Sequence, residues 1–246
     1  MKILSLGHAT FVLTTSNNRV VYLDPWISEN PVCPIKLEQV HEADIVCVTH
    51  GHRDHFGDAL ELVKRTKAIL VCSPDLAKYA ESTGVNYGQL FYVDGGSYPL
   101  DIGGSVTIKD TEIVMTNALH TSELRTGTET TQGSGSCGYV ITDTTGIGVY
   151  HAGDTALFSD MKLIRELYQP RVCLLPVGGR YNMGIREAAI ATSFLSPNVV
   201  IPMHYDTYPT QKADIKKFAE MVNLLAPRTQ VIVLKPGEST TYPTST

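Results

Sequence analysis

Residues 48–58 read Val-Thr-His-Gly-His-Arg-Asp-His-Phe-Gly-Asp and hold four potential metal ligands: His50, His52, Asp54 and His55. A short apolar run leads into this stretch and is typical of a buried strand, and apolar residues at helical spacing follow it. We therefore predict a strand-to-helix loop. In extended backbone side chains alternate, so His50, His52 and Asp54 would point to the same side. The spacing predicts one metal between His50 and His52. His55 would point away from the other three side chains, so Asp54 and His55 would hold a neighbouring ion.

Histidine is sparse in the rest of the chain. Only eight histidines occur among the 246 residues, and three of them stand in this one stretch with an aspartate between them. The alternative is a polar surface loop that happens to be rich in histidine. Imidazole and carboxylate groups at such short spacing are typical of zinc sites, so we favour the metal interpretation.

The overall composition fits one large domain over residues 1–246. Hydrophobic residues make up 43% of the chain, which supports a substantial core, and no linker divides it. The net charge of −5 counts against nucleic acid as a partner, because phosphate backbones need clustered Lys and Arg. No apolar run is long enough to cross a bilayer, so we expect a small-molecule substrate and no membrane partner. A homo-oligomer stays an open alternative.

The first residues and the cysteines both indicate a cytoplasmic protein. The opening Met-Lys-Ile-Leu-Ser-Leu lacks the long apolar core of a signal peptide and is expected to form the first strand. The five cysteines are odd in number, lack a Cys-x-x-Cys pair and stand mostly in apolar runs. We expect reduced thiols without disulfides, none of them a nucleophile.

Two halves of the chain share one pattern. Strands are expected over 2–6, 10–14 and 19–23, and again over 138–142, 147–150, 172–176 and 199–203. Helices are expected after the histidine-rich stretch and between the later strands. Both halves place ligand-type residues at strand ends. The pattern predicts an α/β (α+β) fold of two packed β-sheets flanked by helices, with the site on one edge.

Three further ligand candidates follow apolar runs. They are His120, Asp154 (after Gly153, which leaves room for an ion) and His204. Alone, each would more often be a surface side chain or part of a turn. The presence of the histidine-rich stretch favours the interpretation of each as a metal ligand. Asp24 also ends a strand, and we interpret it as a residue that orients a ligand through a hydrogen bond. His8 and His151 would either act in the same way or make structural hydrogen bonds.

Residues 121–136 show no periodicity and are dominated by Thr, Gly and Ser. They are expected to form either a flexible loop or a cover over a bound substrate.

The motif His50-Gly51-His52-Arg53-Asp54-His55 resembles the His-x-His-x-Asp-His signature of the metallo-β-lactamase fold superfamily. Asp24, His120, Asp154 and His204 stand in the chain order of its other motifs, so the resemblance covers nearly the whole chain. Finer features are similar to a branch of small metal-dependent hydrolases related to L-ascorbate-6-phosphate lactonase and, more remotely, to N-acylphosphatidylethanolamine phospholipase D. These features are Leu6-Gly7-His8-Ala9-Thr10, Asp24-Pro25-Trp26, Tyr150-His151-Ala152-Gly153-Asp154-Thr155 and Pro202-Met203-His204-Tyr205.

This resemblance implies a four-layer αββα sandwich of two mixed β-sheets with a dinuclear site. By motif position, His50, His52 and His120 would bind one divalent ion. Asp54, His55 and His204 would bind the other, and Asp154 would bridge them. Zinc is expected because the ligands are imidazoles and carboxylates without thiolate, with manganese or iron as alternatives.

The function implied is hydrolysis of a lactone or a phosphate ester. A hydroxide that bridges the two ions would attack the substrate, with Asp54 and Asp154 as the catalytic carboxylates. Arg180, Tyr181 and Arg125 are the candidate substrate contacts. The segment 178–184 departs from the branch motif at Arg180 and Asn182, so the substrate specificity of the branch does not follow from the resemblance alone.

Three alternatives share the predicted fold. The first is phosphodiesterase or nuclease-type activity on small phosphodiesters. The second is a di-iron redox protein. His52 argues against it, because flavodiiron proteins usually have glutamate at this position. The third is a metal-binding protein without catalysis, against which the full ligand set argues.

Overall fold

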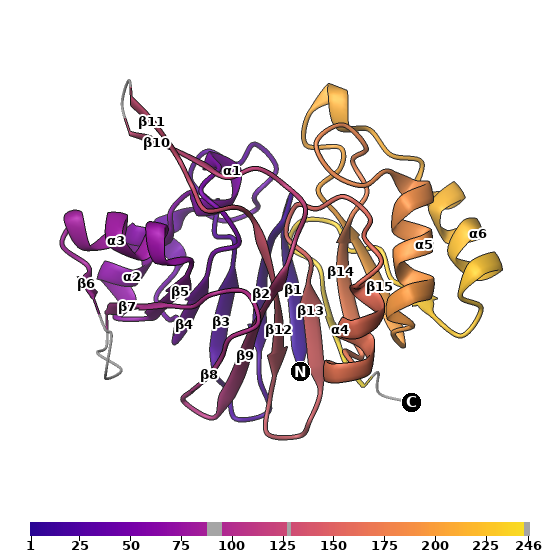
Figure 1. Ribbon diagram of the computed structural model, residues 1–246, viewed down its shortest axis with the longest axis horizontal. Helices are drawn as coiled ribbons and strands as arrows, with labels where there is room; N and C mark the ends of the chain where they lie inside the picture. The colour runs from indigo at the N-terminus through magenta and orange to yellow at the C-terminus, as the bar shows by residue number, and fades with distance from the viewer. Residues whose placement is uncertain (88–94, 127–128, 244–246) are drawn as a thin grey trace.

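The structure is a computed structural model that describes residues 1–87, 95–126 and 129–243. Two β-sheets pack face to face, and helices cover both outer faces (Figure 1). This is the predicted four-layer αββα arrangement. No helix in these ranges is long and apolar enough to cross a membrane.

The first sheet holds eight strands in the spatial order β17-β1-β2-β3-β4-β5-β7-β6. Their bounds are β17 (Ser239–Thr241), β1 (Lys2–Gly7), β2 (Thr10–Thr14), β3 (Val20–Leu23), β4 (Ile45–Cys47), β5 (Ile69–Cys72), β7 (Gly96–Pro99) and β6 (Asn86–Tyr87). The strands from β17 to β3 pair antiparallel, and those from β3 to β6 pair parallel. The sheet is therefore mixed, as predicted.

The second sheet holds seven strands in the order β16-β15-β14-β13-β12-β9-β8. Their bounds are β16 (Gln230–Val231), β15 (Val199–Met203), β14 (Val172–Pro176), β13 (Gly148–His151), β12 (Cys137–Thr142), β9 (Thr111–Asn117) and β8 (Ser105–Ile108). It too is mixed: the strands from β8 to β13 pair antiparallel and those from β13 to β16 pair parallel.

Six α-helices accompany the sheets in the part of the chain that the structure describes. They are α1 (Arg53–Phe56), α2 (Ala59–Thr66), α3 (Pro74–Ser82), α4 (Met161–Tyr168), α5 (Ile185–Leu195) and α6 (Ile215–Leu225), with 3-10 turns at Leu37–Gln39 and Pro209–Gln211. Apolar residues of α2 and α3 pack on the first sheet, and those of α4, α5 and α6 pack on the second. Each sheet thus buries both faces, which explains the nearly continuous apolar runs of its central strands.

The central core lies between the two sheets, where residues such as Phe11 and Ile45 from one sheet meet Tyr139 and Leu174 from the other. Tyr139 is fully buried, and its hydroxyl donates a hydrogen bond of 2.8 Å to the carbonyl of Val48. Backbone bonds of 3.0 Å from Cys137 N to Thr49 O and 2.9 Å from His204 N to His8 O join the sheets nearby. The sheets are therefore tied together close to the histidine-rich stretch.

Two local expectations were wrong. Asp54 does not continue an extended backbone, because α1 begins at Arg53 and the carbonyl of His52 accepts its first hydrogen bonds. The period-two argument therefore holds only as far as His52.

Residues 121–136 contain a β-hairpin, β10 (Glu123–Thr126) with β11 (Glu129–Gln132), where we expected a loop. The hairpin stands away from both sheets (Figure 1). Among its side chains whose burial is described, Leu124 alone is a buried apolar one, so no apolar alternation marks it. Its Thr-rich composition is the one signal that favours strands.

Candidate metal centre

The predicted ligands come from both sheets and meet at one edge of the sandwich. His50 and His52 lie in the loop after β4, and Asp54 and His55 lie on α1. The second sheet supplies the other three, after β9, β13 and β15: His120, Asp154 and His204. The residues that follow strands of one sheet meet those of the other because the strand ends share this edge.

The first group of ligand atoms consists of three imidazoles, from His50, His52 and His120, whose ligand atoms lie within 4.8 Å of one another. His50 Nε2 lies 2.9 Å from His52 Nδ1, and His120 Nε2 lies 3.3 Å from the same atom. His50 is fully buried, whereas His52 and His120 are partly exposed. The group therefore has one open side.

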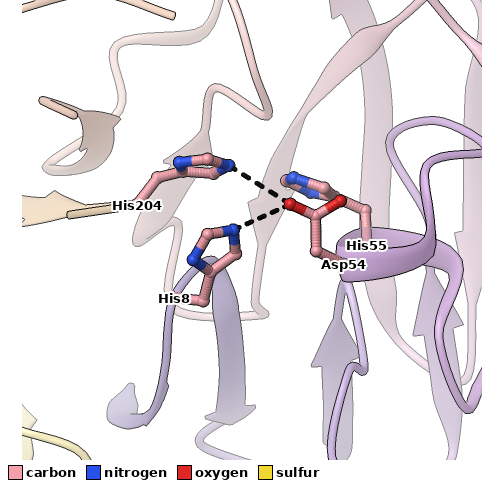
Figure 2. Close-up of side chains that lie close together, drawn as sticks. All are labelled: His8, Asp54, His55 and His204. Atoms are coloured by element: carbon pink, nitrogen blue, oxygen red, sulfur yellow. Dashed lines mark hydrogen bonds and ion pairs between the residues drawn. The ribbon is translucent and has the colours of Figure 1, made fainter. Parts of the chain in front are cut away.

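The second group joins Asp54, His55, His204 and His8 within the same 4.8 Å limit (Figure 2). Asp54 Oδ2 lies 3.0 Å from His8 Nε2 and 3.8 Å from His204 Nε2. The three imidazoles are buried, and the Asp54 side chain is 28% exposed. This group is thus more enclosed than the first, and it carries its own carboxylate.

Asp154 lies between the two groups. Its Oδ2 is 3.0 Å from His204 Nε2 and 3.7 Å from His120 Nε2, and its Oδ1 is 3.6 Å from His55 Nε2. The residue is 2% exposed. One buried carboxylate therefore faces imidazoles of both groups.

The donor atoms fit divalent metal ions. His55 Nε2 and His204 Nε2 are buried without a hydrogen bond of suitable geometry, although they face the Asp154 carboxylate at 3.6 and 3.0 Å. Unpaired buried polar atoms are costly, and a cation next to this carboxylate would satisfy both nitrogens. Imidazole and carboxylate ligands suit zinc, iron or manganese.

The charges of the site also favour a cation. Burial holds the pKa of His50 well below its ordinary value, so this imidazole is neutral and can bind a metal. Burial alone would lower the pKa of His55, but Asp154 and Asp24 raise it well above the usual range. Burial likewise opposes charge on Asp154, yet His204 and His55 hold its pKa well below normal. The carboxylates therefore stay ionised, and positive charge next to them, from a protonated His55 or from a bound cation that replaces its proton, balances them.

Asp24 lies behind the ligands. Its carboxylate contacts His55 Nδ1 at 2.7 Å and accepts hydrogen bonds from Thr49 N at 2.8 Å and Thr49 Oγ1 at 2.7 Å. Thr49 Oγ1 lies 2.9 Å from His50 Nδ1. Asp24 thus contacts one ring directly and another through Thr49.

His8 and His151 differ from each other. His151 Nε2 donates to the carbonyl of Ala9 at 2.8 Å, and its Nδ1 accepts from Gly153 N at 3.1 Å, so its role is structural. His8 joins the second group directly, and burial lowers its pKa to about 4. The sequence placed His8 beside a motif but gave no sign that it would reach Asp54.

Asn182 contacts the centre in a way that the sequence did not predict. Its Nδ2 donates a hydrogen bond of 3.1 Å to Asp154 Oδ1, and its Oδ1 is buried without a partner. The only signal was its departure from the branch motif, which we related to substrate specificity. The structure places Asn182 against a candidate ligand.

The residues predicted to contact the substrate lie outside the two ligand groups. Arg180 and Tyr181 are exposed and stack on each other, with the guanidinium 5.4 Å from the ring centroid. They share the loop of Asn182, beside the centre. The side chain of Arg125 lies outside the described residues.

The αββα sandwich and the cluster at its edge define a metallo-β-lactamase fold with a candidate metal centre. A family profile described as a β-lactamase superfamily domain matches residues 2–204. The chain is 42% identical over 239 residues to a UPF0173 metal-dependent hydrolase of Methanopyrus kandleri, covering 97% of this chain and 99% of that one. It is 39% identical over 240 residues to one of Methanosphaera stadtmanae, covering 97% and 98%.

A solved structure agrees with these relatives. A metallo hydrolase from the hyperthermophilic archaeon Ignicoccus hospitalis superposes with a TM-score of 0.82 at 35% identity, covering 97% of each chain. The chain therefore belongs to the UPF0173 metal-dependent hydrolases of the β-lactamase superfamily. The resemblance stated from the sequence motifs is confirmed.

Proposed function

We propose that this metal-dependent hydrolase cleaves a lactone or a phosphate ester with two divalent ions, zinc in the first place. The position of Asp154 carries the proposal, because one buried carboxylate lies 3.0 to 3.7 Å from imidazoles of both groups. A shared carboxylate of this kind suits two neighbouring ions better than one.

Each ion would have its own ligands. His50, His52 and His120 would hold the first ion, and Asp54, His55 and His204 the second, with Asp154 shared. When bound, such ions supply Lewis acidity and lower the pKa of a water from ~16 toward ~7.

Asp54 and Asp154 are the proposed catalytic carboxylates. Asp54 is the more accessible, and its Oδ2 is held by His8 Nε2 at 3.0 Å. The other His8 nitrogen lies 2.9 Å from Thr207 Oγ1, so the ring is fixed at both ends. Asp54 would orient the attacking water and take up its proton. Asp154, enclosed and held by Asn182, would keep the ligand geometry constant.

The proposed partner is a small molecule, and Arg180, Tyr181 and Arg125 are proposed to contact its polar part. A cytoplasmic location is proposed because all five cysteines are free and four of them are buried.

Metal analysis and a substrate panel test the proposal together. The purified protein is expected to hold two zinc ions per chain and to hydrolyse members of a panel of lactones, phosphodiesters, phosphomonoesters and β-lactams. Turnover of lactones or phosphate esters that is lost on chelation and restored by zinc supports it. A stoichiometry of one ion, or turnover that survives complete removal of metal, would refute it.

A further inference from the structure

A cleft of about 640 Å³ opens beside the candidate metal centre. His52 and Asp54, one from each ligand group, line its inner end. Its walls come from α1, α2, α3 and β10. This volume lies in the range of roughly 300–1,000 Å³ typical of small-molecule sites. A substrate whose reacting bond lies at the metal centre could therefore place a substituent in this cleft.

The outer wall of the cleft is apolar. It is formed by Phe56, Leu60, Tyr79 and Leu124. The rings of Phe56 and Tyr79 lie 5.9 Å apart, and Leu124 is only 9% exposed. An apolar wall that leads directly away from a polar centre favours a substrate part that is apolar too.

The β10 side of this wall is fixed to the metal-binding loop. Gly51 N donates to Ser122 Oγ at 3.1 Å, just before Leu124 in the chain. The backbones also approach closely, since a Cβ at Gly51 would lie 2.9 Å from the carbonyl oxygen of Glu123. Gly51 therefore permits a contact that any larger residue would obstruct. Leu124 is held in place relative to His52 by this contact.

The charges of the cleft disfavour an anionic arm. Among the described residues that line it, the one Lys or Arg is Arg53, which forms an ion pair with Glu29. The carboxylates that line it are Asp54 and Glu123. The cation of the described lining is thus already paired with a carboxylate outside it, so an acidic arm would compete with Glu29 for Arg53, whereas a neutral apolar arm needs no cation.

The apolar path continues beyond the cleft. Tyr79 and Leu124 also line a second hollow of about 440 Å³, together with Leu76 and the β11 residue Thr131. An arm longer than the first cleft would thus meet further apolar surface.

We infer that the substrate carries an uncharged apolar arm next to the hydrolysed bond, and that this arm lies between α2, α3 and β10. The inference rests on the proposed function only in placing the reacting bond at the metal centre. The polar side of the substrate would then face the loop of Arg180 and Tyr181.

A binding series tests the cleft without turnover. Straight-chain alkanoates from acetate to decanoate would be titrated calorimetrically into the zinc-loaded protein, with the carboxylate at the metal centre and the chain in the cleft. We expect the Kd to fall about fourfold for each added methylene, equivalent to about 0.8 kcal/mol, until the apolar path is filled. A Kd independent of chain length would overturn the inference.

Two leucines provide a matched comparison. Leu60 lines the cleft and is half-buried on α2, whereas Leu163 is 50% exposed on α4 at the other side of the molecule. Leu60→Ser is expected to reduce the gain per methylene to below about twofold, and Leu163→Ser to keep the wild-type gain. Leu60→Trp fills the cleft, so the gain should stop at shorter chains. Equal series in all the variants would place the chain elsewhere and overturn the inference.

Turnover separates this inference from the proposed function. γ-Lactones with increasing alkyl substituents and alkyl p-nitrophenyl phosphates would be compared with the binding series. If one class is hydrolysed with kcat/KM rising with chain length, both proposals are supported. If neither is hydrolysed while the alkanoates still bind more tightly with length, the reaction is refuted and the cleft is supported.

Discussion

The two ligand groups of this site differ in charge and in enclosure. The group of His50, His52 and His120 is made of imidazoles alone and has partly exposed members. The group of Asp54, His55 and His204 has its own carboxylate, and its imidazoles are buried. Charge attraction is stronger where water is excluded. We therefore expect the second group to bind its ion more tightly, and the first to exchange its ion more readily.

The largest effect is expected from the residue that both groups share. Asp154→Ala should lower kcat/KM by on the order of 10³-fold and weaken both ions, because their common carboxylate is lost. Zinc per chain and steady-state kinetics measure the two effects. Asp160→Ala, an exposed carboxylate at the start of α4, is the control and should change neither. Full activity of Asp154→Ala would contradict its shared position.

Removal of one ligand from each group tests the difference directly. His52→Ala and His204→Ala should each retain one zinc per chain. The ion that remains in His52→Ala is held by the carboxylate-containing group, so it should withstand about a tenfold higher chelator concentration than the ion in His204→Ala. Competition with a fluorescent chelator provides the measurement. The opposite order would show that enclosure and charge do not decide the affinity.

An effect smaller than that of Asp154→Ala is expected from the amide that holds Asp154. Asn182→Ala removes the 3.1 Å hydrogen bond to Oδ1 and should weaken zinc binding by roughly 10- to 100-fold. Arg180→Ala, two residues away and exposed, is the matched control and should leave the zinc affinity unchanged. An unchanged affinity in both variants would remove Asn182 from the support of the site.

The smallest effect concerns substrate charge. Arg180→Ala should lower kcat/KM for anionic substrates by about threefold and leave neutral ones nearly unchanged, since an exposed charge contributes little. Paired substrates that differ only in one anionic group make this comparison. Equal losses for both members of a pair would show that Arg180 does not contact the substrate.

The sequence predicts the parts of the site that depend on local order. His50, His52, Asp54 and His55 stand within a few residues of one another, so their proximity is nearly assured by the chain itself. The strand ends that carry the other ligands could also be predicted, because strands buried on both faces are apolar runs with sharp ends. The family motif then related these positions to one another.

Contacts between distant segments could not be predicted in this way. His8 reaches Asp54 across 46 positions and Asn182 reaches Asp154 across 28. In each pair both residues follow strands of the same sheet, so the contact depends on the spatial order of those strands and on the loops after them. The β10–β11 hairpin was missed because periodicity reports burial, and one buried apolar side chain, Leu124, among the described residues of the hairpin makes no period. Strand order and loop conformation, which depend on the whole chain, decide these features.

The buried hydroxyl of Tyr139 joins the two sheets immediately before the histidine-rich stretch. Since each sheet contributes part of the ligand set, any sliding of one layer past the other would pull the donor atoms apart. Bound cations would link ligands from both sheets, so their uptake should raise the melting temperature along with activity. In this enzyme, the stability of the fold and the catalytic activity would both depend on the distance between the ligand atoms of the two sheets.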